Sequence, residues 1–178
     1  AGVFGEKYLP NSEARFGIAV DSLGYELGLR GGDKVLTVNN KPVEDFGSIV
    51  PSIILEEAKT VEVERNGIKT EVRVPAGMIK KIINSEKANI VTPRIPMIVD
   101  SIPSNSPNIN AGFKKNDKII GVNDSLFGFH DQFKAMAKMN AGKKVDLKVL
   151  RGNDTVSLPV SINDKGEVGI FIQADYTK

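Results

Sequence analysis

The chain has 178 residues and a net charge of +2, from 24 Lys and Arg against 22 Asp and Glu, with the two signs interspersed. Nucleic-acid binders usually carry a basic stripe with aromatic residues between the charges, so we expect no nucleic-acid partner. Cysteine is absent, which excludes disulfides, a thiolate nucleophile and Cys-based zinc sites. The longest nearly apolar run, 49–55, is far shorter than the ~20 residues of a membrane-spanning helix. The sequence begins with Ala-Gly and shows no signal-peptide pattern. We therefore expect it to be a soluble fragment of a longer protein.

The sequence contains an internal repeat. Residues 18–23 align with residues 97–102, an offset of 79. After an insertion of five residues, residues 28–40 align with residues 112–124 at an offset of 84. Identities and apolar-for-apolar exchanges stay in step throughout, which predicts two copies of one supersecondary unit. We place the first copy at 1–77 and the second at 78–178, with 78–89 as a linker or as the first strand of the second copy.

Each copy begins with the same predicted elements. A strand (17–23; 97–102) precedes a short helical turn, which ends at Gly28 or Gly112 because glycine suits a helix C-cap with positive φ. A tight turn at Asp33 or Asp117 follows, since these residues tolerate such backbone. Next comes a β-branched strand (35–38; 119–122) that ends in an Asn-containing turn.

A helix and a hairpin complete each copy. Phe46, Val50 and Ile53 predict one apolar helix stripe, and Phe129, Phe133 and Met136 predict the other. Pro51 predicts a kink or a late start of the first helix. The first hairpin turns at Asn66-Gly67, a strong hairpin signal, and the second at Gly152-Asn153. Residues 166–174 are predicted to form a closing strand.

These residues carry a resemblance to a known family. The pattern Gly28-Leu29-Arg30-Gly31-Gly32-Asp33-Lys34-Val35-Leu36, repeated over 112–120, resembles the PDZ domain in its bacterial-protease form. The resemblance implies an α+β fold with two PDZ-like domains. Each would be a small, mostly antiparallel, partly open β-barrel or sandwich capped by two helices.

The tandem arrangement is similar to the periplasmic insert of bacterial site-2 proteases, the regulator-of-sigma-E protease family, and residues 164–170 resemble the stretch that there leads back to the membrane. This implies an extracytoplasmic module of an inner-membrane zinc protease that binds peptide ends and gates access of a single-pass anti-sigma factor during envelope stress. The alternative is the tandem PDZ region of a soluble HtrA-type serine protease-chaperone that recruits misfolded proteins. A third reading is a scaffold without proteolysis.

A peptide adds to a PDZ domain as an extra strand, with its carboxylate in a nest of backbone N–H groups. The family's x-hydrophobic-Gly-hydrophobic loop is matched by Arg15-Phe16-Gly17-Ile18, whereas the second copy has Pro96, which lacks an N–H. We therefore expect the first copy to bind carboxylates and the second to serve mainly as a wall or to bind extended segments. The candidate peptide-binding residues are Arg15, Phe16, Gly17, Ile18, Val20, Phe46, Val50, Arg94, Ile95, Met97, Val99, Phe129, His130 and Phe133.

Several of these residues could instead have an ordinary structural position. Arg15 and Arg94 either attract a carboxylate or decorate solvated loops, and the apolar candidates either line a pocket or form ordinary core. His130 either selects a ligand side chain or is simply solvated at a helix start. Asp33 and Asp117 are interpreted as turn residues.

We expect no catalytic centre in this chain. The zinc proteolysis of the resembled family requires H-E-x-x-H and a distant Asp, but the chain has a single histidine. Zinc therefore belongs to the resembled parent protease, and we predict no cofactor or metal here. A Ser-His-Asp triad lacks both a suitable acid beside His130 and a Gly-x-Ser-x-Gly elbow.

Overall fold

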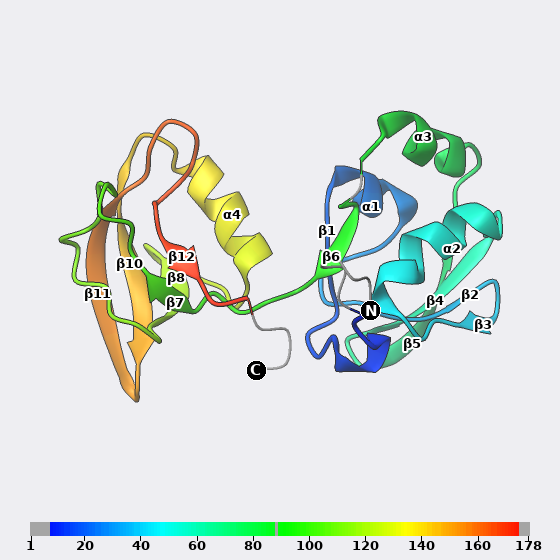
Figure 1. Ribbon diagram of the computed structural model, residues 1–178, viewed down its shortest axis with the longest axis horizontal. Coiled ribbons are helices and arrows are strands. Elements are labelled where there is room, and N and C mark those ends of the chain that lie inside the picture. Colours follow the sequence, from blue (N-terminus) through cyan, green and yellow to red (C-terminus); the bar gives the residue numbers. More distant parts are fainter. Residues whose placement is uncertain (1–7, 88, 175–178) are drawn as a thin grey trace. The chain divides into compact units, whose positions relative to one another are not determined.

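The computed structural model describes residues 8–87 and 89–174. The chain divides into two compact units, and the boundary lies between Arg94 and Ile95. Each unit has its own hydrophobic core and its own four-stranded antiparallel sheet (Figure 1). The architecture is α+β with mostly antiparallel strands, as expected from the resemblance.

The first unit builds one four-stranded and one two-stranded sheet. The larger sheet has the order β3-β2-β4-β5, and β1 pairs with β6 in the smaller one. The Asn66-Gly67 turn between β4 and β5 has positive φ at both residues, 52° and 78°, as a primed hairpin turn requires. The elements are η1 (Asn11–Glu13), β1 (Ile18–Val20), α1 (Ser22–Leu27), β2 (Lys34–Val38), β3 (Lys41–Pro42), η2 (Phe46–Ser48), α2 (Ile49–Leu55), β4 (Thr60–Arg65), β5 (Ile68–Arg73), α3 (Met78–Ser85) and β6 (Val91–Pro93).

The second unit repeats this plan with fewer helices. Its sheets have the orders β11-β10-β8-β9 and β12-β7. The expected helical turn before Gly112 is replaced by turns over 103–111, where Pro103 and Pro107 remove amide donors that a helix needs. The elements are β7 (Val99–Ser101), β8 (Lys118–Val122), β9 (Ser125–Leu126), α4 (His130–Met139), β10 (Lys144–Arg151), β11 (Asp154–Ser161) and β12 (Phe171–Ile172).

Helix α2 starts late, as Pro51 predicts. A 3-10 turn precedes it, and Pro51 occupies the third position of the α-helix, where no intrahelical N–H bond is lost. The buried stripe differs from the expected one by a residue: Ile49 and Ile53 are buried in α2, and Phe133 and Ala137 in α4. The two helices therefore align at the same offset of 84 as the preceding turns.

The predicted domain boundary after Gly77 is corrected by the packing of residues 78–94. Met78, Ile82 and Ile90 are at most 4% exposed and belong to the first core. Strand β6 pairs with β1, with Ile18 opposite Pro93. The segment 78–89 is thus neither a linker nor a strand of the second unit. It carries α3, whose apolar stripe is buried by the first unit, and it leads to that unit's closing strand.

Candidate functional site

The second unit contains an open groove between α4 and the segment 165–172. Its volume is about 690 Å³. The floor is apolar: Met97, Phe133 and Val168 line it and are each at most 5% exposed. The remaining lining residues are Pro103, His130, Lys134, Lys138, Lys165, Gly166, Glu167, Gly169, Ile170, Phe171 and Ile172.

One wall of the groove is a strand with an unoccupied edge. Among residues 8–87 and 89–174, strand β12 has one neighbouring strand, β7, with Ile172 opposite Val99 and Phe171 opposite Ser101. Its other edge belongs to the groove wall that faces α4. An exposed edge of this kind can accept an extended peptide as an added strand.

The loop before β12 presents backbone donors. Within the described part of the chain, the amides of Val168, Gly169 and Ile170 donate no hydrogen bond. Successive free N–H groups in a turn conformation form an anion-binding concavity. Gly169 has φ +75°, and a Cβ there would lie 2.7 Å from Ser106 Oγ. The loop therefore depends on glycine at this position.

The side chains of Asn108, which is buried, and Asn163, which is exposed, hold this loop in place. The Asn108 side-chain amide donates to the Val168 carbonyl over 2.7 Å and to the Ser161 carbonyl over 2.8 Å. Asn163 Oδ1 accepts hydrogen bonds from the amides of Lys165 and Glu167, both 2.9 Å long. Because the carbonyl of Val168 is engaged by Asn108, the loop is fixed without using the amides at 168–170.

The predicted carboxylate nest at Phe16-Gly17-Ile18 is not available. The Gly17 amide donates to the Ala14 carbonyl over 3.0 Å, and the Ile18 amide donates to the Asp33 carbonyl over 2.9 Å. Strand β1 is also occupied on its other side by β6. Gly17 is required for close packing, because a Cβ would lie 2.4 Å from the Asp33 carbonyl oxygen. We therefore correct the prediction that the first copy binds carboxylates at this loop.

The other predicted site residues divide between the groove and the two cores. Met97, His130 and Phe133 line the groove. Core positions or positions packed against the cores are taken by Ile18, Val20, Phe46, Val50 and Val99.

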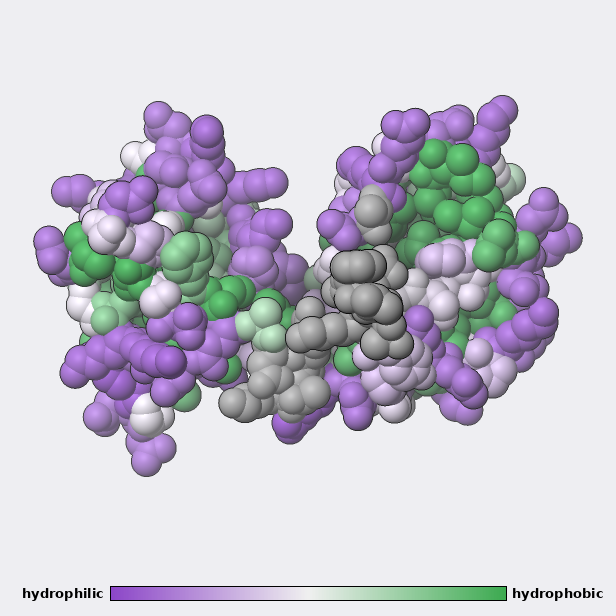
Figure 2. All heavy atoms as spheres, viewed as in Figure 1, coloured by the Kyte–Doolittle hydropathy of each residue, from purple (hydrophilic) through white to green (hydrophobic). Residues whose placement is uncertain are grey.

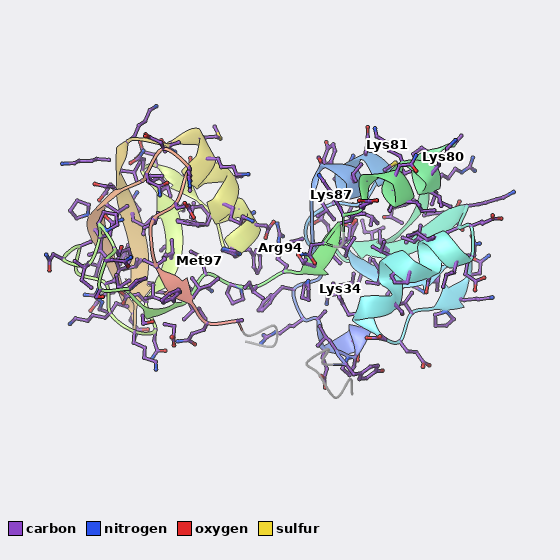
Figure 3. The ribbon with its side chains drawn as sticks, turned by 45° about the horizontal axis from the view of Figure 1, so that its top comes forward. Lys34, Lys80, Lys81, Lys87, Arg94 and Met97 are labelled. Carbon is purple, nitrogen blue, oxygen red and sulfur yellow. The ribbon has the colours of Figure 1, made fainter. Side chains whose placement is uncertain are left out.

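The remaining four predicted residues lie on loops. The Arg15 guanidinium stacks 5.4 Å from the Phe16 ring centroid. The Arg94 guanidinium lies over the turn at Gly32, and Figure 3 shows Arg94 beside β6. Ile95 accepts the His130 amide hydrogen bond at the start of α4, and Phe129 precedes that helix and pairs with Pro96. None of the four lines the groove.

Sequence reasoning missed the loop at Val168-Gly169-Ile170. It has the same hydrophobic-Gly-hydrophobic pattern as Phe16-Gly17-Ile18, so the signal was present but was assigned to another strand. Asn108 was also missed. It lies between residues 102 and 112, where five residues are inserted and the repeat offset changes from 79 to 84.

The first unit carries helix α3 in the corresponding part of its chain. Between its last hairpin strand and its closing strand it carries α3, which packs against α2. Lys81 on α3 also pairs with Glu26 on α1 at 2.7 Å, and Figure 3 labels Lys80 and Lys81 on α3. Apolar residues gather over the region between α3 and α2 (Figure 2). In the second unit a short turn at Asn163 takes the place of this helix.

The groove is electropositive at neutral pH. Lys134, Lys138 and Lys165 are exposed, and none forms an ion pair with any residue among 8–87 and 89–174. Burial lowers the pKa of His130 below its usual value, and the charge of Lys134 lowers it further, against an opposing effect of Asp131. His130 is therefore neutral at pH 7, and the groove's positive charge comes from the lysines.

The described residues contain no cluster of three or more His, Cys, Asp or Glu side chains arranged to hold a metal ion. Over the same residues, no helix is both long and apolar enough to cross a membrane.

Part of the chain matches the model of a known family. Residues 82–162 match the family model described as a PDZ domain. Over this range the chain is similar to a PDZ domain. The matched range starts within α3 and ends after β11, so it includes α4 but stops before the loop and strand that form the other wall of the groove.

Among the curated proteins similar to the chain, three are described as proteases. The "Probable serine protease do-like" of Buchnera aphidicola is 27% identical over 172 residues, which cover 88% of this chain and 34% of that protein. The "Periplasmic pH-dependent serine endoprotease DegQ" of Escherichia coli is 27% identical over 150 residues, covering 74% and 32%. The "Putative zinc metalloprotease NMA0084" of Neisseria meningitidis is 26% identical over 145 residues, covering 76% and 32%. The chain thus spans about a third of the length of these relatives.

Proposed function

We propose that the second unit binds the free carboxyl-terminal ends of peptides and that the chain is the substrate-recruiting module of a larger protease. One observation carries the proposal. The backbone N–H groups of Val168, Gly169 and Ile170 donate no hydrogen bond within the described residues, and they lie beside the open edge of β12. A terminal carboxylate supplies the acceptors that these amides lack.

The geometry supports a specific mode of binding. The peptide backbone extends the β12–β7 sheet as a third strand, so that main-chain hydrogen bonds provide affinity. Its terminal carboxylate lies on the loop at Gly169. Its last side chain enters the apolar floor formed by Met97, Phe133 and Val168, which favours an apolar terminal residue.

The roles of the two units are the reverse of those expected from Pro96. In the first unit α3 packs against α2, the counterpart of α4, so we propose that this unit acts as a rigid wall or spacer. Pro96 lies next to Met97 and is buried, and its missing N–H does not affect the carboxylate loop, because that loop is built from the other end of the unit.

For the parent protein we retain two proposals. In one, the chain is an extracytoplasmic insert of a zinc intramembrane metalloprotease at the inner membrane. This insert gates the access of an anti-sigma factor to the protease during envelope stress. The similarity to the putative zinc metalloprotease of Neisseria meningitidis supports this proposal. In the other, it is the tandem region of an HtrA-type serine protease-chaperone, which the two serine protease relatives support. Flanking hydrophobic segments with H-E-x-x-H would favour the first, and an upstream trypsin-like domain the second.

Peptides that differ only at the carboxyl terminus test the binding proposal. An apolar-ended peptide with a free carboxylate should bind the whole chain at least about tenfold more tightly than the same peptide with an amidated end, because amidation removes the charge that the amides and lysines attract. Fluorescence anisotropy measures both affinities. Equal binding of the two peptides, or no binding of either, would contradict the proposal.

A further inference from the structure

The charges of the groove are concentrated at its rim. Lys134 and Lys138 lie one helical turn apart on the face of α4 that lines the groove, and Lys165 lies on the opposite loop. Among the described lining residues, Glu167 alone is acidic, and its carboxylate accepts a 3.3 Å hydrogen bond from the Asn163 side chain. The rim therefore carries an excess of positive charge.

The side chains of Lys134, Lys138 and Lys165 form no ion pair or hydrogen bond with other described residues. Two other cations of the second unit are paired, Arg151 with Asp117 at 2.8 Å and Lys115 with Asp100 at 3.9 Å. At the equivalent helix positions, 84 residues earlier, the first unit has Val50 and Ile54. Those side chains pack against the first core. The cationic rim thus distinguishes the groove from the corresponding helix of the first unit.

The arrangement of α4 relative to the loop orients a bound peptide. A Cβ on Gly166 would lie 3.0 Å from the Lys138 Cα, so the carboxyl end of α4 lies beside the carboxylate loop. Four residues of helix rise about 6 Å, and two residues of extended strand span nearly the same distance, at about 3.3 Å each. A peptide whose end lies near Lys138 therefore passes Lys134 about two residues before its end.

From this juxtaposition we infer that the groove selects carboxyl-terminal segments with an apolar last residue and at least one Asp or Glu among the three residues before it. The inference rests on the proposed binding function and adds the ligand's charge to it. Ligand carboxylates would pair with Lys134, Lys138 and Lys165, which the protein itself leaves unpaired. Extended segments with lysine or arginine at those positions would be repelled.

Three labelled peptides test this selectivity on the whole chain. They share an apolar terminal residue and a free carboxylate and differ only in carrying Glu-Asp, Gln-Asn or Lys-Lys two and three positions before the end. At low salt the acidic peptide should bind about fivefold more tightly than the amide peptide, and the Lys-Lys peptide more weakly than both. The advantage should shrink when salt shortens the screening length from about 10 Å to about 3 Å. Equal affinities for the acidic and amide peptides would overturn the inference.

A pair of charge-matched variants locates the effect. Replacing both helix lysines, Lys134→Gln with Lys138→Gln, should lower the affinity for the acidic peptide to that for the amide peptide and leave the latter unchanged. The control is Lys143→Gln with Lys144→Gln, which removes the same charge from exposed positions outside the groove and should preserve the preference. Loss of the preference in the control variant would also contradict the inference.

The two proposals fail in different ways. If no peptide distinguishes a free from an amidated end, the binding function is wrong. If the Gln-Asn peptide binds more tightly with a free than with an amidated end, but the Glu-Asp peptide binds no more tightly than the Gln-Asn peptide, only the inferred selectivity is wrong.

Discussion

Replacing Gly169 with alanine is expected to weaken binding of a free carboxyl terminus by about tenfold or more. Gly169 has φ +75°, which costs a residue with a Cβ about 1–2 kcal/mol, and the added Cβ would lie 2.7 Å from Ser106 Oγ. The loop must move to relieve this contact. The amides of Val168, Gly169 and Ile170 then no longer converge on one carboxylate.

Gly152 offers a matched control for this substitution. It has φ +61°, and a Cβ there would meet nothing within 4 Å. Gly152→Ala therefore carries a similar backbone cost in the same unit without touching the groove, and it should bind peptide normally. Anisotropy titration of both variants, with thermal unfolding to confirm that each is folded, separates loss of binding from loss of structure. A folded Gly169→Ala variant with unchanged affinity would remove the loop from the site.

The second large effect is expected at two buried aspartates. Asp33 and Asp117 are each 1% exposed. Asp33 receives two hydrogen bonds from Arg65, of 2.9 and 2.8 Å, and one of 2.9 Å from the Arg30 amide. Because Asp33→Ala leaves these donors without an acceptor, it should destabilise the first unit by about 3 kcal/mol. Asp117, bound in the same way by Arg151 and the Lys114 amide, should behave alike in the second unit.

Urea unfolding with probes in each unit measures these losses. Each substitution should lower the midpoint of its own unit's transition, because the two cores are separate clusters. A surface control is Asp124→Asn, at an exposed turn, which should change stability little. A loss below about 1 kcal/mol for Asp33→Ala would show that the carboxylate is a turn residue only, as the sequence suggested.

Asp117 also makes the stability of the second unit sensitive to acid. Burial alone would raise the pKa of Asp117, but the Arg151 hydrogen bond and the Lys114 amide outweigh it and lower the pKa below its usual value. A carboxyl group with a lowered folded pKa stabilises the fold above its unfolded pKa of about 3.9, and this contribution is lost as pH falls through the folded pKa. The stability difference between wild type and Asp117→Asn should therefore narrow below about pH 4.

Local chemistry made much of each unit predictable from sequence. The Asn66-Gly67 hairpin, the glycine cap at Gly28 with φ 111° and the late start at Pro51 each depend on a few neighbouring residues. The repeat also revealed that Asp33 and Asp117 are equivalent. Their ionic partners were missed, although Arg65 and Arg151 each stand at the end of the first hairpin strand.

The site could not be located because it depends on long-range strand pairing. Both Phe16-Gly17-Ile18 and Val168-Gly169-Ile170 match the same local pattern. Only the pairing of β1 with β6, and of β12 with β7, decides which loop keeps free amides. The domain boundary was misplaced for the same reason, since β6 returns to pair with a strand more than seventy residues earlier.

Binding of chain ends by the second unit at the loop before β12 is tested most directly by amide NMR. An isotope-labelled whole chain is titrated with a peptide that has an apolar last residue and a free carboxylate. We predict the largest shifts at the amides of Val168, Gly169 and Ile170, with smaller shifts along α4 and none at Gly17 or Ile18. Shifts centred on Gly17 and Ile18, with the loop at Gly169 unaffected, would contradict the account.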